Sequence, residues 1–214
     1  MTEKTAKKEE QSEYPDDNEC ERLFEDYCLP ENVREHNRQV TKVADLIASK
    51  FNEKGHLVDS QLVHSAAMLH DIARPIDVTD FSEFSEGCTT LWKDLKKRFQ
   101  HVRHPEAAYL LLKDTYPEVA KVIRKHAYKA IISYDPEIRP LTREEKIVTY
   151  ADKRVTHTDI VSLNERFEEG HKRWQKEPHY DPDLVQELDN KYFELEKELF
   201  SKIDIEPEQI TNNS

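Results

Sequence analysis

Six residues of metal-binding type fall on the apolar faces of predicted helices: His36, His70, Asp71, His104, His126 and Asp152. His36 lies three residues after Val33 and four before Val40, so it points with the buried stripe of its helix. Asp152 follows Val148 by four in the same way. A buried carboxylate without a partner costs several kcal/mol. Such a group is expected to pair, to lose its charge or to bind a metal ion.

A structural role is the alternative for each of these residues taken alone. A single inward histidine is more often a hydrogen-bonded core residue than a ligand, and a His-Asp dipeptide is expected about once by chance in a chain with 10 histidines. Ordinary cores, however, have no reason to collect so many polar residues from separate helices. Four imidazoles and two carboxylates without a thiolate suit iron, manganese, cobalt or zinc, and suit calcium poorly.

The other histidines serve as a comparison. His171 lies at helical spacing between Phe167 and Trp174 and is interpreted as a half-buried packing residue. The rest do not fall cleanly on an apolar stripe and are expected to be solvated: His56, His64, His101, His157 and His179.

Apolar residues recur at helical spacing along most of the chain, and only three glycines are available for tight turns. An all-α fold is therefore predicted. Helix starts are indicated at Pro30, at Asp59 and at Asp181-Pro182, where the helix should reach Phe200. His104-Pro105 reads as a cap and first helical residue, and Thr142 with Glu145 forms a capping-box pattern.

The predicted organisation is one compact helical domain with flanking segments. Residues 1–17 and 204–214 are expected to be disordered acidic tails, with the domain at 18–180 and a further helix at 181–203. Residues 75–100 read as an irregular insertion that regains helical character around LWKDLKKRF.

The formal net charge is −12, and most of the negative excess lies in the two ends of the chain. Long nucleic acid is therefore not an expected partner, and no apolar stretch is long enough to span a membrane. The start has no apolar core of a signal peptide. Three cysteines without a CxxC pair fit reduced thiols, so a cytoplasmic protein is expected.

The order H…HD…D, formed by His36, His70-Asp71 and Asp152, resembles the HD-domain superfamily of metal-dependent phosphohydrolases. The resemblance runs from about 30 to 167 and includes VREHNRQV, LVHSAAMLHDIAR, HPEAAYLLL, VIRKH and TREEKIVTYADK. It implies that these four residues bind one metal ion. His104 and His126 occupy the places of the extra ligands in two-metal members, where Asp71 would bridge both ions. Ala73 replaces the glycine of the common HDIG signature.

The resemblance implies hydrolysis of a small phosphate ester or nucleotide by a metal-activated hydroxide. Two divalent transition ions, iron or manganese ahead of zinc or cobalt, would activate the water and clamp the phosphoryl group. Fixed cations should lie near the ions. Arg74 follows His70 by four and Lys129 follows His126 by three, so both are candidate catalytic residues. Lys153 points about 100° away from Asp152 along the helix and is the weaker candidate. For all three, a solvated surface cation is the alternative.

Two other functions are compatible with the same residues. Some proteins with this arrangement use two irons to oxidise a small substrate with dioxygen, and a helical module could also bind a ligand without catalysis. The last helix carries a near-heptad stripe that would suit packing on the domain or pairing in a homodimer, formed by Leu184, Leu188, Tyr192, Leu195 and Leu199.

Overall fold

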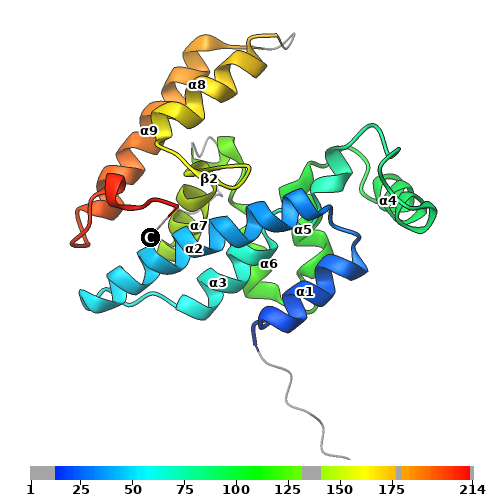
Figure 1. The fold of residues 1–214 in the computed structure, drawn as a ribbon, viewed down its shortest axis with the longest axis horizontal. Coiled ribbons are helices and arrows are strands. Elements are labelled where there is room, and N and C mark those ends of the chain that lie inside the picture. The colour runs from blue at the N-terminus through cyan, green and yellow to red at the C-terminus, as the bar shows by residue number, and fades with distance from the viewer. Residues whose placement is uncertain (1–12, 132–140, 177–179, 213–214) are drawn as a thin grey trace, which may run out of the picture.

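The computed structural model describes residues 13–131, 141–176 and 180–212, and within them the fold is all-α, as predicted (Figure 1). A two-stranded antiparallel hairpin, which the sequence did not indicate, is the only sheet in these ranges, with Val155 paired to Ile160. The α-helices are α1 (Asp17–Asp26), α2 (Glu31–Glu53), α3 (Ser60–Leu69), α4 (Glu86–Arg98), α5 (His104–Leu112), α6 (Pro117–Arg124), α7 (Arg143–Lys153), α8 (Leu163–Trp174) and α9 (Pro182–Phe200). The short elements are η1 (Arg74–Asp77), η2 (Tyr128–Ile131), η3 (Pro207–Gln209), β1 (Val155–Thr156) and β2 (Asp159–Ile160).

Local capping sets most helix starts where the sequence predicts them. The carboxylate of Asp59 accepts a hydrogen bond from the Leu62 amide at the start of α3. Thr142 and Glu145 form the predicted capping box of α7. Helix α5 differs by one residue, because Arg103 is its N-cap and His104 is already helical.

The core is built from the long α2 packed against α3 and α7, with α6 behind them. Its largest fully buried side chains include Ile47, Leu69, Ile123 and Ile147, one from each of these helices. Helices α8 and α9 run side by side and project from this body, and α4 lies at its opposite side (Figure 1). The central helices therefore form the closely packed part of the molecule, and two peripheral parts flank it.

The last helix packs on its own domain. Leu188, Tyr192, Leu195 and Leu199 of the predicted stripe are buried against the rest of the chain. The ring of Tyr192 stacks on Tyr128 of η2 with centroids 5.3 Å apart. Most of the stripe is thus used within one copy of the chain, and the expected homodimer stays a prediction.

The predicted tails are too long at both ends. Asp16 caps α1, and the Tyr14 hydroxyl donates a hydrogen bond to Asp59, so the folded part begins before residue 17. Residues 204–212, predicted to be disordered, pack on the domain: Ile210 is buried, and Arg154 donates hydrogen bonds to the carbonyls of Pro207 and Ile210. Residues 1–12 and 213–214 lie outside the described residues. Buried arginine donors need acceptors, which this segment supplies.

The expectation of three reduced thiols is wrong for two of them. Cys28 and Cys88 form a disulfide between the loop after α1 and the first turn of α4, while Cys20 is a buried free thiol. The bond spans 60 residues of sequence. It fastens the inserted segment 75–100, whose helix α4 begins at Glu86, to the N-terminal part of the domain. No helix among the described ranges is both long and apolar enough to cross a bilayer.

His64 was expected to be solvated because it lies off the apolar stripe, but in the structure it has two carboxylate partners. Its Nδ1 lies 2.8 Å from the carboxylate of Asp45 on α2, and its Nε2 lies 2.6 Å from that of Asp17 on α1. The hydrogen bond with Asp45 outweighs partial burial and, with Asp17, raises the pKa of His64 to about 9. The protonated ring therefore ties three helices together. His179, also expected to be solvated, lies outside the described residues.

We expect Cys28→Ser to lower the free energy of unfolding by about 2–4 kcal/mol, because the bond restricts the unfolded chain. Urea denaturation without reductant measures this. Adding reductant should bring the wild-type protein to the stability of the variant and leave a Cys28→Ser/Cys88→Ser protein unchanged. Three titratable thiols in unreduced, unfolded wild-type protein would contradict the assignment.

We expect the stabilising effect of His64 to depend on pH. A raised pKa in the folded state gives stability that is complete below the unfolded value near 6.5 and is lost as pH rises through about 9. The stability difference between wild type and His64→Gln should therefore shrink between pH 6.5 and 10. A difference that stays constant over this range in urea titrations would show that the ring is neutral in the folded protein.

Candidate metal centre

The structure brings together all six predicted donor residues from five parts of the chain. His36 comes from α2, the His70-Asp71 pair follows α3, and Asp152 comes from the last turn of α7. His104 opens α5, and His126 follows α6. Four of the six residues are at most 9% exposed: His70, Asp71, His126 and Asp152.

Three of these positions lie at helix ends rather than on helix faces. His70 is the C-cap of α3, His104 is the first residue of α5, and His126 lies two residues past α6. The structure still brings them beside the other donors, because the chain continues in tight turns: the His126 amide donates to the Ile123 carbonyl. Ends of helices meeting at one point leave more room for an ion than packed faces do.

One donor group joins His36, His70 and the two aspartates. Oδ1 of Asp152 lies 3.3 Å from Nε2 of His36 and 3.7 Å from Nε2 of His70. On the other side, Nε2 of His70 is 3.9 Å from Oδ2 of Asp71. Ligand atoms about 2.0–2.2 Å from a common ion are themselves roughly 3–4 Å apart. These separations fit that spacing.

A second donor group joins Asp71 to the two remaining histidines. Its Oδ1 lies 3.1 Å from Nε2 of His104 and 3.6 Å from Nε2 of His126, and the two Nε2 atoms are 3.1 Å apart. One ligand atom from each of His36, His70 and Asp71 lies within 4.8 Å of the other two. The same holds for Asp71, His104 and His126. The carboxylate of Asp71 thus turns one oxygen toward each group.

The four imidazole rings are oriented by hydrogen bonds at Nδ1. Nδ1 of His36, His70 and His126 faces the backbone carbonyls of His157, Ala67 and Ile123 at 3.0, 2.8 and 2.6 Å. A carbonyl oxygen can only accept, so the proton must lie on each Nδ1. The lone pair of a neutral ring is then on Nε2, the atom that points into the cluster.

Asp77 completes this pattern for His104 and is the residue that the sequence analysis missed. Its Oδ2 accepts from Nδ1 of His104 at 2.6 Å. Burial opposes the charge of Asp77, but the hydrogen bond with His104 outweighs it and lowers the pKa of the carboxyl. Asp77 lies in η1, inside the irregular insertion, where no periodicity marks it. Carboxylates in this position orient metal-binding histidines.

Burial and charge act against each other at the donors. Burial raises the pKa of the Asp71 carboxyl, but His104 and His70 outweigh it and hold the pKa well below its ordinary value. At Asp152 burial is likewise outweighed, here by the charge of Lys153 and by the contacts with His36 and His70, so the pKa of this carboxyl is also held well below its ordinary value. Burial lowers the pKa of His126 to about 4, so this ring is neutral at pH 7. Because their pKa values are lowered, the carboxylates of Asp71 and Asp152 are both ionised at neutral pH.

The donor set fits a bound cation better than a purely structural role. Nε2 of His70 is fully buried and has no hydrogen-bond partner among the described residues. Its neighbours are carboxylate oxygens and other imidazole nitrogens, which cannot all donate to one another. A divalent ion satisfies all of these acceptors at once, and nitrogen and oxygen donors suit a transition metal.

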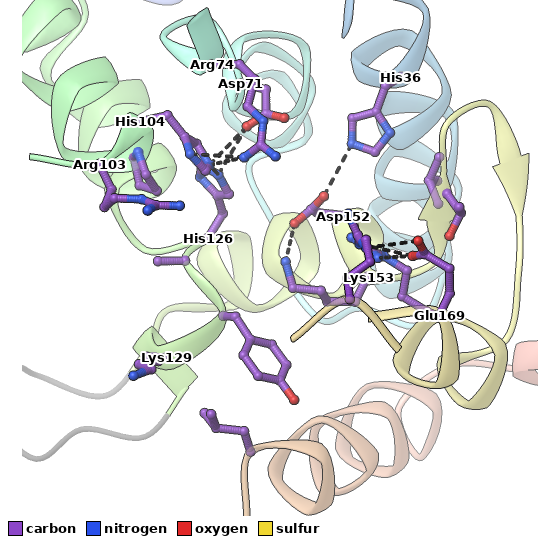
Figure 2. Close-up of a pocket in the computed structure, with 18 of the residues that line it drawn as sticks. His36, Asp71, Arg74, Arg103, His104, His126, Lys129, Asp152, Lys153 and Glu169 are labelled. Carbon is purple, nitrogen blue, oxygen red and sulfur yellow. Dashed lines mark hydrogen bonds and ion pairs between the residues drawn. The ribbon is translucent and has the colours of Figure 1, made fainter. Parts of the chain in front are cut away.

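The predicted cations reach the site to different degrees. Arg74 lies beside His104, with Nη1 3.8 Å from Oδ2 of Asp77, and lines the pocket. Lys129 is exposed on the pocket wall, away from the donor cluster in Figure 2. The orientation expected for Lys153 is wrong: its Nζ forms a direct ion pair with Oδ2 of Asp152. A long lysine side chain can curl back although its Cβ points elsewhere.

The donor cluster opens into a pocket of about 870 Å³. Figure 2 shows His104, His126, Asp71 and Arg74 on one side and His36 with Asp152 on the other. A further arginine, Arg103, joins the wall near His104. The volume falls in the range of small-molecule sites. The arrangement can place a small anionic ligand directly against the donor cluster.

Comparison with known proteins agrees with this geometry. The family model of the HD domain matches residues 33–156, which is more than half of the chain. The chain therefore belongs to the HD domain family, whose members are mostly metal-dependent hydrolases. No curated protein and no solved structure matched the chain.

We expect Asp77→Ala to weaken metal binding by roughly 10–100-fold at the donor group containing His104, because the ring loses its orienting partner. Isothermal titration with Mn²⁺ measures the affinity, and elemental analysis measures the metal content. Asp77→Asn keeps an acceptor and should lose less. Asp80→Ala, an exposed aspartate nearby, is the matched control. Equal affinities for Asp77→Ala and Asp80→Ala would overturn the role given to Asp77.

Proposed function

We propose that the protein is a metal-dependent phosphohydrolase that cleaves a small phosphate ester or nucleotide. The observation that carries this proposal is the pair of donor groups that share Asp71, with every histidine presenting Nε2 to the cluster. We assign one divalent transition ion to each group, iron or manganese before zinc or cobalt. Bound there, the ions would lower the pKa of a water molecule and neutralise charge on a phosphoryl group.

The residues of the chain divide the remaining work. His36, His70, Asp71 and Asp152 would hold one ion, and Asp71, His104 and His126 the other. Lys153 pairs with the outer oxygen of Asp152, which leaves the inner oxygen to face His36 and His70. Hydrolysis forms one P–O bond from water and breaks the ester P–O bond, releasing an alcohol and phosphate.

Arginines and lysines of the pocket wall would bind the phosphoryl oxygens. Arg74 lies at the donor cluster and is 45% exposed, so its guanidinium can reach an incoming anion. Arg103 lies on the same side, and Lys129 approaches from η2. Arginine binds phosphate through two parallel hydrogen bonds, so Arg74 is the main candidate for holding the substrate.

We expect the protein, loaded anaerobically with iron or manganese, to release phosphate from members of a phosphoester and nucleotide panel. Asp71→Ala should lower kcat/KM about a thousandfold, because several kcal/mol of charge stabilisation are lost. Its metal content should fall in parallel. Asp80→Ala should keep both properties. Arg74→Ala should mainly raise KM, because a substrate contact is removed.

Three results would contradict the proposal. Oxygen consumption with a small organic substrate, without phosphate release, would indicate a di-iron oxygenase. Unchanged turnover and metal content in Asp71→Ala would indicate that the cluster is structural. A metal-loaded protein inert toward the whole panel would leave a ligand-binding module as the explanation.

A further inference from the structure

The pocket extends beyond the part of the chain that matches the HD domain. The family match ends at residue 156, whereas α8 and α9 supply a separate section of the pocket wall. We call this section the distal arm and define it by its lining residues: Arg166, Glu169, Arg173, Leu184, Val185 and Leu188. In Figure 2 Glu169 lies on the far side of Asp152 and Lys153 from His104.

One wall of the distal arm is apolar. Leu184, Val185 and Leu188 come from the first two turns of α9. Tyr128 of η2 also lines the pocket, and its ring is stacked on Tyr192 of α9. The Tyr128 hydroxyl donates to the buried carboxylate of Asp189, which fixes the ring in place. Rigid apolar and aromatic surfaces of this kind bind flat or apolar ligand groups.

The opposite wall carries two arginines and one glutamate, and Asp181, which also lines the pocket, brings the formal charges into balance. Glu169 accepts hydrogen bonds from Arg166 at 3.2 Å and from Arg173 at 3.0 Å. Near the donor cluster, by contrast, Arg74 and Lys129 lie among groups that would also hold two divalent ions. With two divalent ions bound, the pocket would be strongly cationic only at the metal end. The distal arm offers paired donors and an acceptor instead of a net positive charge.

The distal arm is also poorly suited to a second phosphate. The amides at the start of α9 are a common kind of anion site, but here the carboxylate of Asp181 already accepts from the amides of Asp183 and Leu184. The carboxylate of Glu169 would repel a further anion entering the arm. A neutral group with hydrogen-bonding edges has neither disadvantage.

We propose that the distal arm is a specificity subsite for the uncharged ring system of a phosphate monoester, such as the nucleoside of a nucleoside monophosphate. This inference rests on the proposed phosphohydrolase function, because the phosphate must lie at the donor cluster. The ring packs on Leu184 and Val185, and its polar edge binds Glu169 and Arg166. Preference for the leaving group is thereby set by α8 and α9, outside the matched domain.

The test compares substrates that share a phosphate and differ in the attached group. The manganese-loaded full-length protein is assayed with the four common nucleoside 5′-monophosphates, glycerol 3-phosphate and hexyl phosphate. At least one nucleotide should exceed glycerol 3-phosphate in kcat/KM by about tenfold. Leu184→Asp and Glu169→Gln should each reduce this ratio about fivefold or more, through KM, and leave turnover of glycerol 3-phosphate within about twofold.

Each variant has a matched control of the same residue type. Glu168→Gln alters an exposed neighbour on α8 that does not line the pocket, and Leu57→Asp alters a leucine that is 84% exposed elsewhere. Both should behave as wild type. Glu169→Gln only replaces a carboxylate with an amide of the same shape, so it remains informative if Leu184→Asp fails to fold. It should also improve the use of nucleoside diphosphates, since the repelling charge is removed.

The outcomes separate this inference from the proposed function. Equal kcat/KM for all monoesters, or a preference for hexyl phosphate unaffected by Glu169→Gln, would overturn the subsite and leave hydrolysis standing. If nothing is hydrolysed, the proposed function fails, and isothermal titration with AMP and with inorganic phosphate decides. AMP binding that is about tenfold tighter, and lost in both arm variants, supports the subsite; equal affinities overturn it.

Discussion

The position of one proton on each of four histidines governs the whole centre. Three backbone carbonyls and the carboxylate of Asp77 accept from the Nδ1 atoms, and this leaves each Nε2 facing the carboxylates of Asp71 and Asp152. Acceptors crowded together in a buried space are unfavourable unless something positive satisfies them. Much of the helical scaffold can be understood as a means of holding these carbonyls and rings in place against that cost.

The scaffold meets this demand with closely packed central helices and short turns. His36 and Asp152 lie within α2 and α7, whereas the His70-Asp71 pair, His104 and His126 lie where helices begin or end. The last carbonyls of a helix have no partner within the helix and can accept from a side chain, as those of Ala67 and Ile123 do from His70 and His126. The hairpin contributes in the same way, because the carbonyl of His157, in its turn, orients His36.

Helical spacing and capping patterns predicted the all-α fold and singled out the six donor residues, because helix spacing and helix caps both depend on local sequence. Features set by contacts between distant segments were not predictable in this way. Asp77 faces His104 across 27 residues, Cys28 bonds to Cys88 across 60, and Ile210 is buried beside Arg154. Lys153 was misplaced for another reason: backbone direction does not fix the end of a long flexible side chain.

The disulfide encloses a particular part of the chain. His36, His70, Asp71 and Asp77 all lie between Cys28 and Cys88, whereas His104, His126 and Asp152 lie outside this covalent ring. In an oxidised chain that has lost its tertiary structure, His36 and the His70-Asp71 pair stay within one closed loop, so their encounter carries a smaller entropic penalty. In the oxidised, unfolded chain, three donors of one group thus stay tethered near each other without the fold that orients them.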